Sequence, residues 1–188
     1  MTPPTASRPD IATPDRTISV IQGEVHISAD PEAVLSTILG SCVAVCMWDP
    51  VAGVGGMNHF LLPTQAGRKG ETVKYGAHAM ELLINGLLRK GASRDTLVCK
   101  LFGGASMARH SSGIGQSNIT FAKSYLRDEG IPIEAESIGG NEARRVRFWA
   151  TTGRAKLLIV PRIDDDPELK PTVVTPRQPP QEPDITLF

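Results

Sequence analysis

Short apolar segments, many of them β-branched, recur through the middle of the chain and are separated by glycines. This pattern constrains the fold more than any other feature, because seven such segments predict strands. Only residues 72–90 and 117–129 place apolar residues at alternating spacings of three and four, which predicts helices. We therefore expect an α+β fold in which mixed β-sheet layers, sandwich-like, are flanked by a few helices. The predicted strands lie near residues 18–21, 25–28, 41–48, 96–102, 131–138, 144–150 and 155–160.

Proline and glycine are segregated along the 188 residues. Four of the 15 prolines fall in residues 1–16 and six in residues 164–188, whereas all 18 glycines lie between Gly23 and Gly153. Proline-rich, glycine-free ends with little apolar periodicity have little surface to bury. We expect a single domain over residues 17–163, a disordered N-terminal tail (1–16) and a proline-rich, mobile C-terminal tail (164–188).

Charge and cysteine content narrow the classes of function. Twenty Lys and Arg residues balance twenty Asp and Glu residues, which argues against a nucleic-acid partner or an anionic membrane surface. No apolar run approaches the roughly 20 residues that span a bilayer, and the N-terminus lacks a signal-peptide core, so we expect a cytoplasmic protein without membrane insertion. No C-x-x-C is present and the histidines show no ligand spacing, so no metal site is expected. Cys46 and Cys99 lie in apolar strands and are expected in the core.

Cys42 and His59 are the candidate reactive pair. Cys42 follows the corner formed by Gly40 and Ser41, where exposed backbone N–H groups can stabilise a thiolate and an oxyanion. A free thiol is mostly protonated at neutral pH, so it needs a base. His59 follows a glycine-rich turn, residues 53–56, that can fold the chain back beside Cys42. A cysteine can also be a buried small hydrophobe, and a lone histidine a structural one. The residues alone leave both interpretations open.

A nearly continuous run of 27 residues from Thr37 to Pro63, TILGSCVAVCMWDPVAGVGGMNHFLLP, resembles the signature of the chemoreceptor glutamine deamidase family, CheD. Further segments resemble that family in the same order. They are KYGAHAMELLINGLLRKGA (its first long helix), KLFGGASM (its Gly-Gly-Ala segment), IGQSN (a helix start) and IGGNEARRVRFWATTGRAKL (its closing strand pair). The resemblance covers about residues 17–162 and leaves both tails unmatched.

This resemblance implies a protein-glutamine glutaminase, a hydrolase of chemotaxis signal transduction. Such an enzyme converts selected glutamine side chains of methyl-accepting chemotaxis proteins to glutamate through a cysteine thioester. The resemblance implies a Cys-His-Thr triad in which Cys42 is the nucleophile, His59 the base and Thr37 the orienting hydroxyl. Some members place the threonine six residues before the cysteine, where this chain has Ser36, so Ser36 is the alternative to Thr37. No metal and no organic cofactor is implied.

The implied partners are the cytoplasmic helices of chemoreceptors and a CheC-type phosphatase, and we expect a monomer. Two other functions stay open. One is a chemotaxis adaptor that binds receptors or a phosphatase without catalysis, and the other is a cysteine hydrolase that acts on another amide. The Cys42 and His59 pair argues against the adaptor, because binding alone does not require it.

Overall fold

The computed structural model describes residues 15–63, 69–106 and 113–160, so the tail predicted over 164–188 and most of the tail predicted over 1–16 lie outside the described residues. The described elements follow one another in the order β1 (Arg16–Ser19), β2 (Val25–Ser28), β3 (Ala33–Leu39), β4 (Val43–Asp49), β5 (Val54–Phe60), α1 (Lys69–Arg89), a 3₁₀ turn (Arg94–Thr96), β6 (Val98–Gly103), α2 (Ile114–Asp128), β7 (Ile133–Ile138), β8 (Ala143–Trp149) and β9 (Ala155–Val160).

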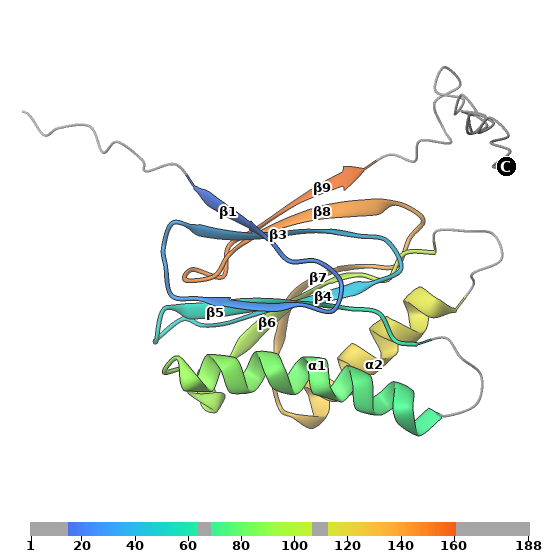
Figure 1. Ribbon diagram of the computed structural model, residues 1–188, viewed down its shortest axis with the longest axis horizontal. Coiled ribbons are helices and arrows are strands. Elements are labelled where there is room, and N and C mark those ends of the chain that lie inside the picture. Colours follow the sequence, from blue (N-terminus) through green and yellow to red (C-terminus); the bar gives the residue numbers. More distant parts are fainter. Residues whose placement is uncertain (1–14, 64–68, 107–112, 161–188) are drawn as a thin grey trace, which may run out of the picture.

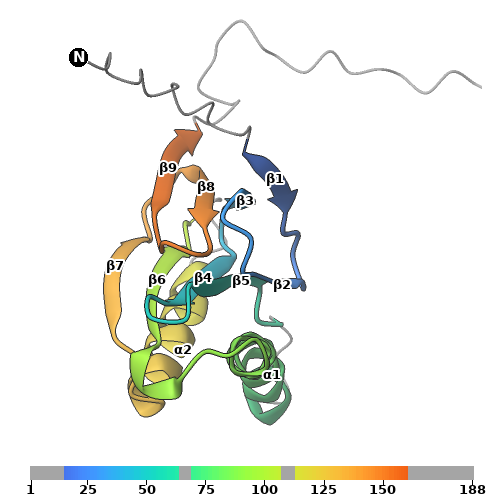
Figure 2. The same cartoon turned by 90° about the vertical axis from the view of Figure 1, so that its left-hand side faces the viewer.

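The strands form two mixed sheets. One has the order β1-β3-β8-β9 and the other the order β2-β5-β4-β6-β7, and each contains one parallel pair among antiparallel ones. The sheets lie face to face, and both helices cover the far side of the five-stranded sheet (Figures 1 and 2). This layering of sheet, sheet and helices confirms the predicted α+β fold.

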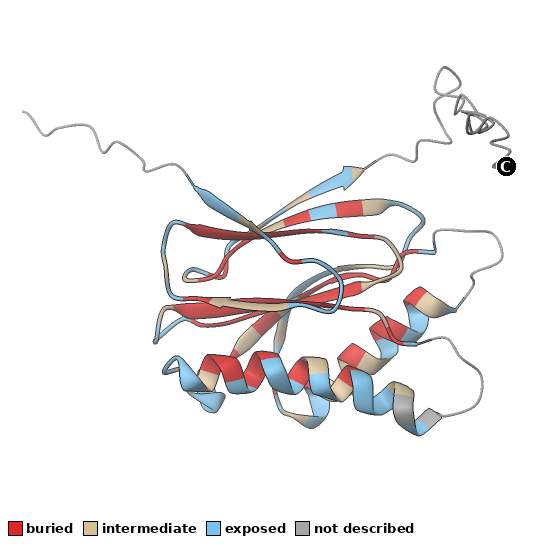
Figure 3. Ribbon diagram, viewed as in Figure 1, coloured by how far each residue is buried: buried red, intermediate tan, exposed pale blue. Residues whose placement is uncertain are grey.

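Strand β4 contributes side chains to two hydrophobic cores. It lies in the middle of the five-stranded sheet and is buried along its whole length (Figure 3). Because side chains alternate across a strand, Val43 and Val45 face the helices, whereas Ala44 and Cys46 face the other sheet. A strand covered on both faces is expected to be apolar throughout, which is why the sequence here reads as a continuous apolar run.

Two strands were not predicted, and both carry residues of the candidate site. β3 lies just before the cysteine corner, and β5 contains most of the glycine run that we interpreted as a turn. That interpretation was wrong for Gly55 and Gly56, because Gly53 alone of these three glycines has the positive φ of a turn residue. An added Cβ at Gly55 would lie 2.1 Å from the carbonyl oxygen of Ala150, so the glycine permits close packing within a strand.

The helices begin three residues earlier than predicted. α1 buries Met80, Ile84 and Leu87 on the expected face, but Val73, which belongs to the same spacing, is 55% exposed. Among the described residues, no helix combines the length and the apolar character that crossing a membrane requires.

Candidate active site

The candidate residues meet at one end of the layer between the two sheets. Thr37 lies on β3 of one sheet, and His59 lies on β5 of the other. Cys42 immediately precedes β4 and packs against the core between the sheets. His59 pairs directly with Ala44, so Cys42, two residues before Ala44, is its diagonal neighbour, at a Cβ separation of roughly 7–8 Å or less. The fold thus brings together all three residues that the sequence singled out.

Two hydrogen bonds orient the imidazole of His59. Its Nδ1 lies 2.9 Å from Thr37 Oγ1 and 3.2 Å from the carbonyl oxygen of Val20. A carbonyl oxygen can only accept, so Nδ1 carries the hydrogen and Nε2 keeps a free lone pair. Nε2 is buried and has no hydrogen-bond partner within the described part of the chain. This tautomer leaves a buried, unprotonated nitrogen that can act as a base.

Because side chains alternate along β3, Thr37 and Ser36 point to opposite faces of the sheet. Thr37 shares its face with Leu35 and Leu39, which belong to the core between the sheets, so its hydroxyl points toward His59. Ser36 borders the same pocket but makes no hydrogen bond with His59 in the described residues. Of the two alternatives, only Thr37 contacts the imidazole.

The backbone around Cys42 is held by the segment that follows β6. The carbonyl oxygen of Cys42 accepts from the N–H of Gly104 at 2.7 Å, and that of Gly40 accepts from Ala105 at 2.8 Å. The N–H groups of Ser41 and Cys42 have no acceptor on another residue in the described part of the chain. These two N–H groups are therefore available to an oxyanion, as the glycine corner predicts.

Two residues support this corner, and the sequence interpretation gave neither of them a role. Asn118 of α2 is fully buried; its amide donates to the carbonyl oxygen of Ser41 at 2.9 Å and accepts from the N–H of Leu62 at 2.8 Å. Gly103 has φ 108°, and an added Cβ would lie 2.1 Å from the carbonyl oxygen of Cys42. The detectable signal for Asn118 was a polar residue on the apolar stripe of a helix, next to Ile119.

Burial keeps the reactive pair neutral. It raises the pKa of the Cys42 thiol above its usual value, and contact with the residue's own N–H offsets part of that rise. Burial also lowers the pKa of His59, while the bond to Val20 and the charge of Glu24 offset part of that decrease. At neutral pH the site therefore holds a thiol beside an uncharged imidazole, which is the proton arrangement that general-base activation requires.

Cys46 and Cys99 are buried in the core, which confirms the prediction for both. Burial raises the pKa of Cys46 well above its usual value and that of Cys99 to about 12. Only Cys42 is half exposed, so it is the one described thiol that a reagent or a substrate can reach.

A pocket of about 280 Å³ opens beside the imidazole, with Thr37 and His59 in its wall. Its lining also includes Gln22, Ile21, Ile38 and Arg145. Ile21 and Ile38 are 62% and 50% exposed, so the rim is apolar and accessible. In the described ranges, no three His, Cys, Asp or Glu side chains gather closely enough to hold a metal ion.

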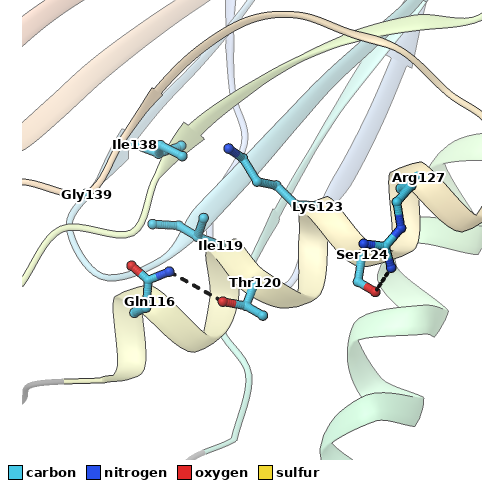
Figure 4. A pocket seen from close by; sticks show the side chains of 8 residues that line it. All are labelled: Gln116, Ile119, Thr120, Lys123, Ser124, Arg127, Ile138 and Gly139. Atoms are coloured by element: carbon cyan, nitrogen blue, oxygen red, sulfur yellow. Dashed lines mark hydrogen bonds between the residues drawn. The ribbon is translucent and has the colours of Figure 1, made fainter.

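A second cavity, between α2 and the end of β7, lacks this chemistry (Figure 4). Its cations are already engaged, since Lys123 pairs with Glu136 at 2.8 Å and Arg127 with Asp128 at 3.2 Å. Its lining contains no histidine, whereas the lining of the pocket of about 280 Å³ includes His59 and Thr37. The pocket beside His59 is therefore the better candidate for catalysis.

A half-exposed thiol, an oriented neutral imidazole and a hydroxyl are the groups that cysteine hydrolases combine. The family model described as CheD chemotactic sensory transduction matches residues 61–158. The probable chemoreceptor glutamine deamidase CheD of Caulobacter sp. (strain K31) is 55% identical over 152 residues, which cover 80% of each chain. The protein of the same name from Acidiphilium cryptum (strain JF-5) is 50% identical over 195 residues, which cover all of both chains. The chain belongs to the CheD family.

Among solved structures, the hypothetical protein YfiH of Bacillus licheniformis is similar over 65% of this chain and 59% of its own, with 16% identity and a TM-score of 0.39.

Proposed function

We propose that this protein is a chemoreceptor glutamine deamidase, in which Cys42 is the nucleophile, His59 the general base and Thr37 the residue that orients the base. The observation that carries the proposal is the orientation of His59. Its Nδ1 is bound by Thr37 and Val20. Its buried Nε2 has no hydrogen-bond partner among the described residues, and the side chain lies on the same sheet face as Cys42. Family membership and the names of the close relatives support the reaction and its substrate.

The first half of the reaction forms a thioester. His59 Nε2 takes the proton of the Cys42 thiol, and the sulfur attacks the carbonyl carbon of a glutamine side chain. The carbonyl oxygen becomes an oxyanion, which can be stabilised by the N–H groups of Ser41 and Cys42, since these donate to no other residue in the ranges that the structure describes. The C–N bond breaks, and protonated His59 delivers its proton to the departing ammonia.

The second half of the reaction restores the thiol. His59, again neutral, takes a proton from a water molecule as its oxygen attacks the thioester carbon. The C–S bond breaks, the thiolate regains a proton from His59, and the product is a glutamate side chain. The carboxyl proton passes to ammonia, so glutamine and water become glutamate and ammonium, and the atoms balance without a cofactor.

The rim of the pocket favours a protein substrate over a small amide. Ile21 and Ile38 are exposed apolar residues at its edge, and Arg145 adds a cation to its lining. Exposed apolar side chains that border a reactive pocket are typical of a surface that contacts another protein. We propose the cytoplasmic helices of chemoreceptors as that partner, with the protein acting as a monomer in the cytoplasm and a CheC-type phosphatase as a second partner.

Mass spectrometry of a receptor signalling domain tests this function directly. After incubation with the protein, we expect the amide-to-acid mass increase at particular glutamines, and none with Cys42→Ala. An adaptor would bind the domain without any mass change in it. A hydrolase of another amide would leave the domain unchanged but would release ammonia from its own substrate in a Cys42-dependent way. Either of these results would overturn the proposal.

A further inference from the structure

The side-chain carboxamide of Gln22 contacts the candidate nucleophile, Cys42. The Cys42 thiol donates a hydrogen bond to Gln22 Oε1, with the sulfur 3.3 Å from the oxygen. In the described part of the chain this is the only hydrogen bond of the Gln22 side chain. The group that contacts the thiol is therefore the same chemical group, the primary carboxamide of a glutamine, that the proposed reaction consumes.

The loop between β1 and β2 holds the backbone of Gln22 at the site. The N–H of Gly23 donates to the carbonyl oxygen of His59 at 2.7 Å, and the N–H of His59 donates to that of Glu24 at 3.0 Å. Val20, at the other end of the loop, binds the imidazole of His59 through its carbonyl oxygen. The backbone is thus fixed to His59 on both sides, whereas the side chain of Gln22 is exposed and free to turn away.

The Gln22 carboxamide is in an unreactive orientation. Attack by sulfur requires the carbonyl carbon to face the sulfur at about 3–3.5 Å, with the oxygen directed at hydrogen-bond donors that stabilise the oxyanion. Here the oxygen itself faces the sulfur and accepts the proton of the thiol. The thiol is also turned to Gln22, and it makes no hydrogen bond to His59 in the described residues.

We propose that Gln22 is a built-in, unreactive occupant of the substrate carboxamide position, which the incoming glutamine must displace before Cys42 can pass its proton to His59. This inference rests on the proposed deamidase function, since it identifies the group that the substrate replaces. Displacement has a defined kinetic consequence. The apparent affinity for substrate is reduced by the fraction of molecules in which the position is free, whereas turnover in the complex is unaffected because Gln22 has already left.

Three variants separate this role from others. Gln22→Ala removes the occupant, and Gln22→Glu replaces it with a carboxylate that opposes formation of the thiolate. Gln116→Ala is the matched control, because Gln116 is also exposed and, among the described residues, its side chain bonds only to Thr120 of its own helix. Thermal unfolding followed by circular dichroism should give similar curves for all of them.

The first measurement is the rate at which iodoacetamide alkylates Cys42, which needs no receptor. Because a thiol S–H is a weak donor, loss of this hydrogen bond lies at the low end of the usual range and should speed alkylation roughly two- to five-fold in Gln22→Ala. Gln22→Glu should be slower than the wild type, and Gln116→Ala unchanged. Alkylation of Gln22→Ala at or below the wild-type rate would overturn the proposal.

The second measurement is steady-state deamidation of a receptor fragment. Gln22→Ala should lower KM with little change in kcat. A fall in kcat would instead make Gln22 a residue that assists the reaction, and conversion of Gln22 to glutamate in the wild type but not in Cys42→Ala would make it a substrate, so either result refutes the occupant. If no variant converts the fragment, the proposed function fails, whereas the alkylation rates still decide whether Gln22 shields the thiol.

Discussion

The role of Thr37 can be tested by removing its hydroxyl while keeping its shape. Thr37→Val preserves the β-branched side chain but deletes the oxygen that lies 2.9 Å from His59 Nδ1. The carbonyl oxygen of Val20, 3.2 Å away, still accepts the Nδ1 hydrogen, so the imidazole keeps its tautomer. We therefore expect a loss of orientation but no loss of the base.

The size of the effect follows from this arrangement. Loss of one of two neutral hydrogen bonds costs about 0.5–1.5 kcal/mol, which corresponds to a decrease in kcat of roughly 2- to 13-fold. Loss of the correct tautomer would cost far more, on the order of 10⁴-fold in a well-studied triad of this type. Because Thr37 positions the base and does not touch the substrate, KM should change little in Thr37→Val. Thr37→Ser, which keeps the hydroxyl, should retain most of the turnover.

The assay is steady-state deamidation of a receptor fragment by Thr37→Val, Thr37→Ser and Ser36→Ala. Ser36 lies on the adjacent position of β3 and does not bond to His59, so Ser36→Ala should retain most of the activity. Wild-type turnover in Thr37→Val would remove the hydroxyl from the mechanism. A larger loss of turnover in Ser36→Ala than in Thr37→Val would assign the orienting role to Ser36. A loss near 10⁴-fold in Thr37→Val would mean that Val20 does not hold the tautomer.

Three further predictions follow from burial and hydrogen bonding. Limited iodoacetamide treatment of the native protein should label Cys42 well before Cys99, because burial raises the pKa of Cys99 to about 12. The acid limb of kcat/KM plotted against pH should lie below the usual histidine value of 6.5, because burial lowers the pKa of His59 and the neutral imidazole is the active form. Asp49 stabilises the turn after β4. Burial alone would raise the pKa of its carboxyl group, but hydrogen bonds from Thr96 and three backbone N–H groups lower that pKa from 3.8 to about 2. This contribution, on the order of 2 kcal/mol, is present above pH 3.8 and is lost as the pH falls toward 2. Urea unfolding of Asp49→Asn should therefore change less over that range than unfolding of the wild type.

Each of these predictions has a contrary result. Labelling of Cys99 as fast as Cys42 would mean that the core opens readily. An acid limb above pH 6.5 would mean that a neighbouring negative charge outweighs burial at His59. Equal acid sensitivity of Asp49→Asn and the wild type would mean that Asp49 does not hold its turn as a carboxylate.

The sequence by itself determined the class of fold and singled out the candidate reactive residues. The apolar spacings of α1 and α2 and the continuous apolar run of β4 are local signals, so they could be read without neighbours. Cys42, His59 and Thr37 were identified from one dense segment and its resemblance to the CheD family. The candidate site could be recognised because its three residues lie in one continuous segment of the chain: Thr37 on β3, Cys42 at the corner before β4 and His59 on β5.

Only the tertiary structure decided which side chains face one another. β1 pairs with β3 in one sheet while β2 pairs with β5 in the other, and no local pattern specifies such a partition, since it depends on pairings between distant segments. The same sheet placement turns Thr37 inward to His59 and leaves Ser36 without that contact. Gln22 comes from a separate loop and has no periodic signature, so its contact with Cys42 arises because the chain folds that loop over the site and fixes it to the backbone of His59.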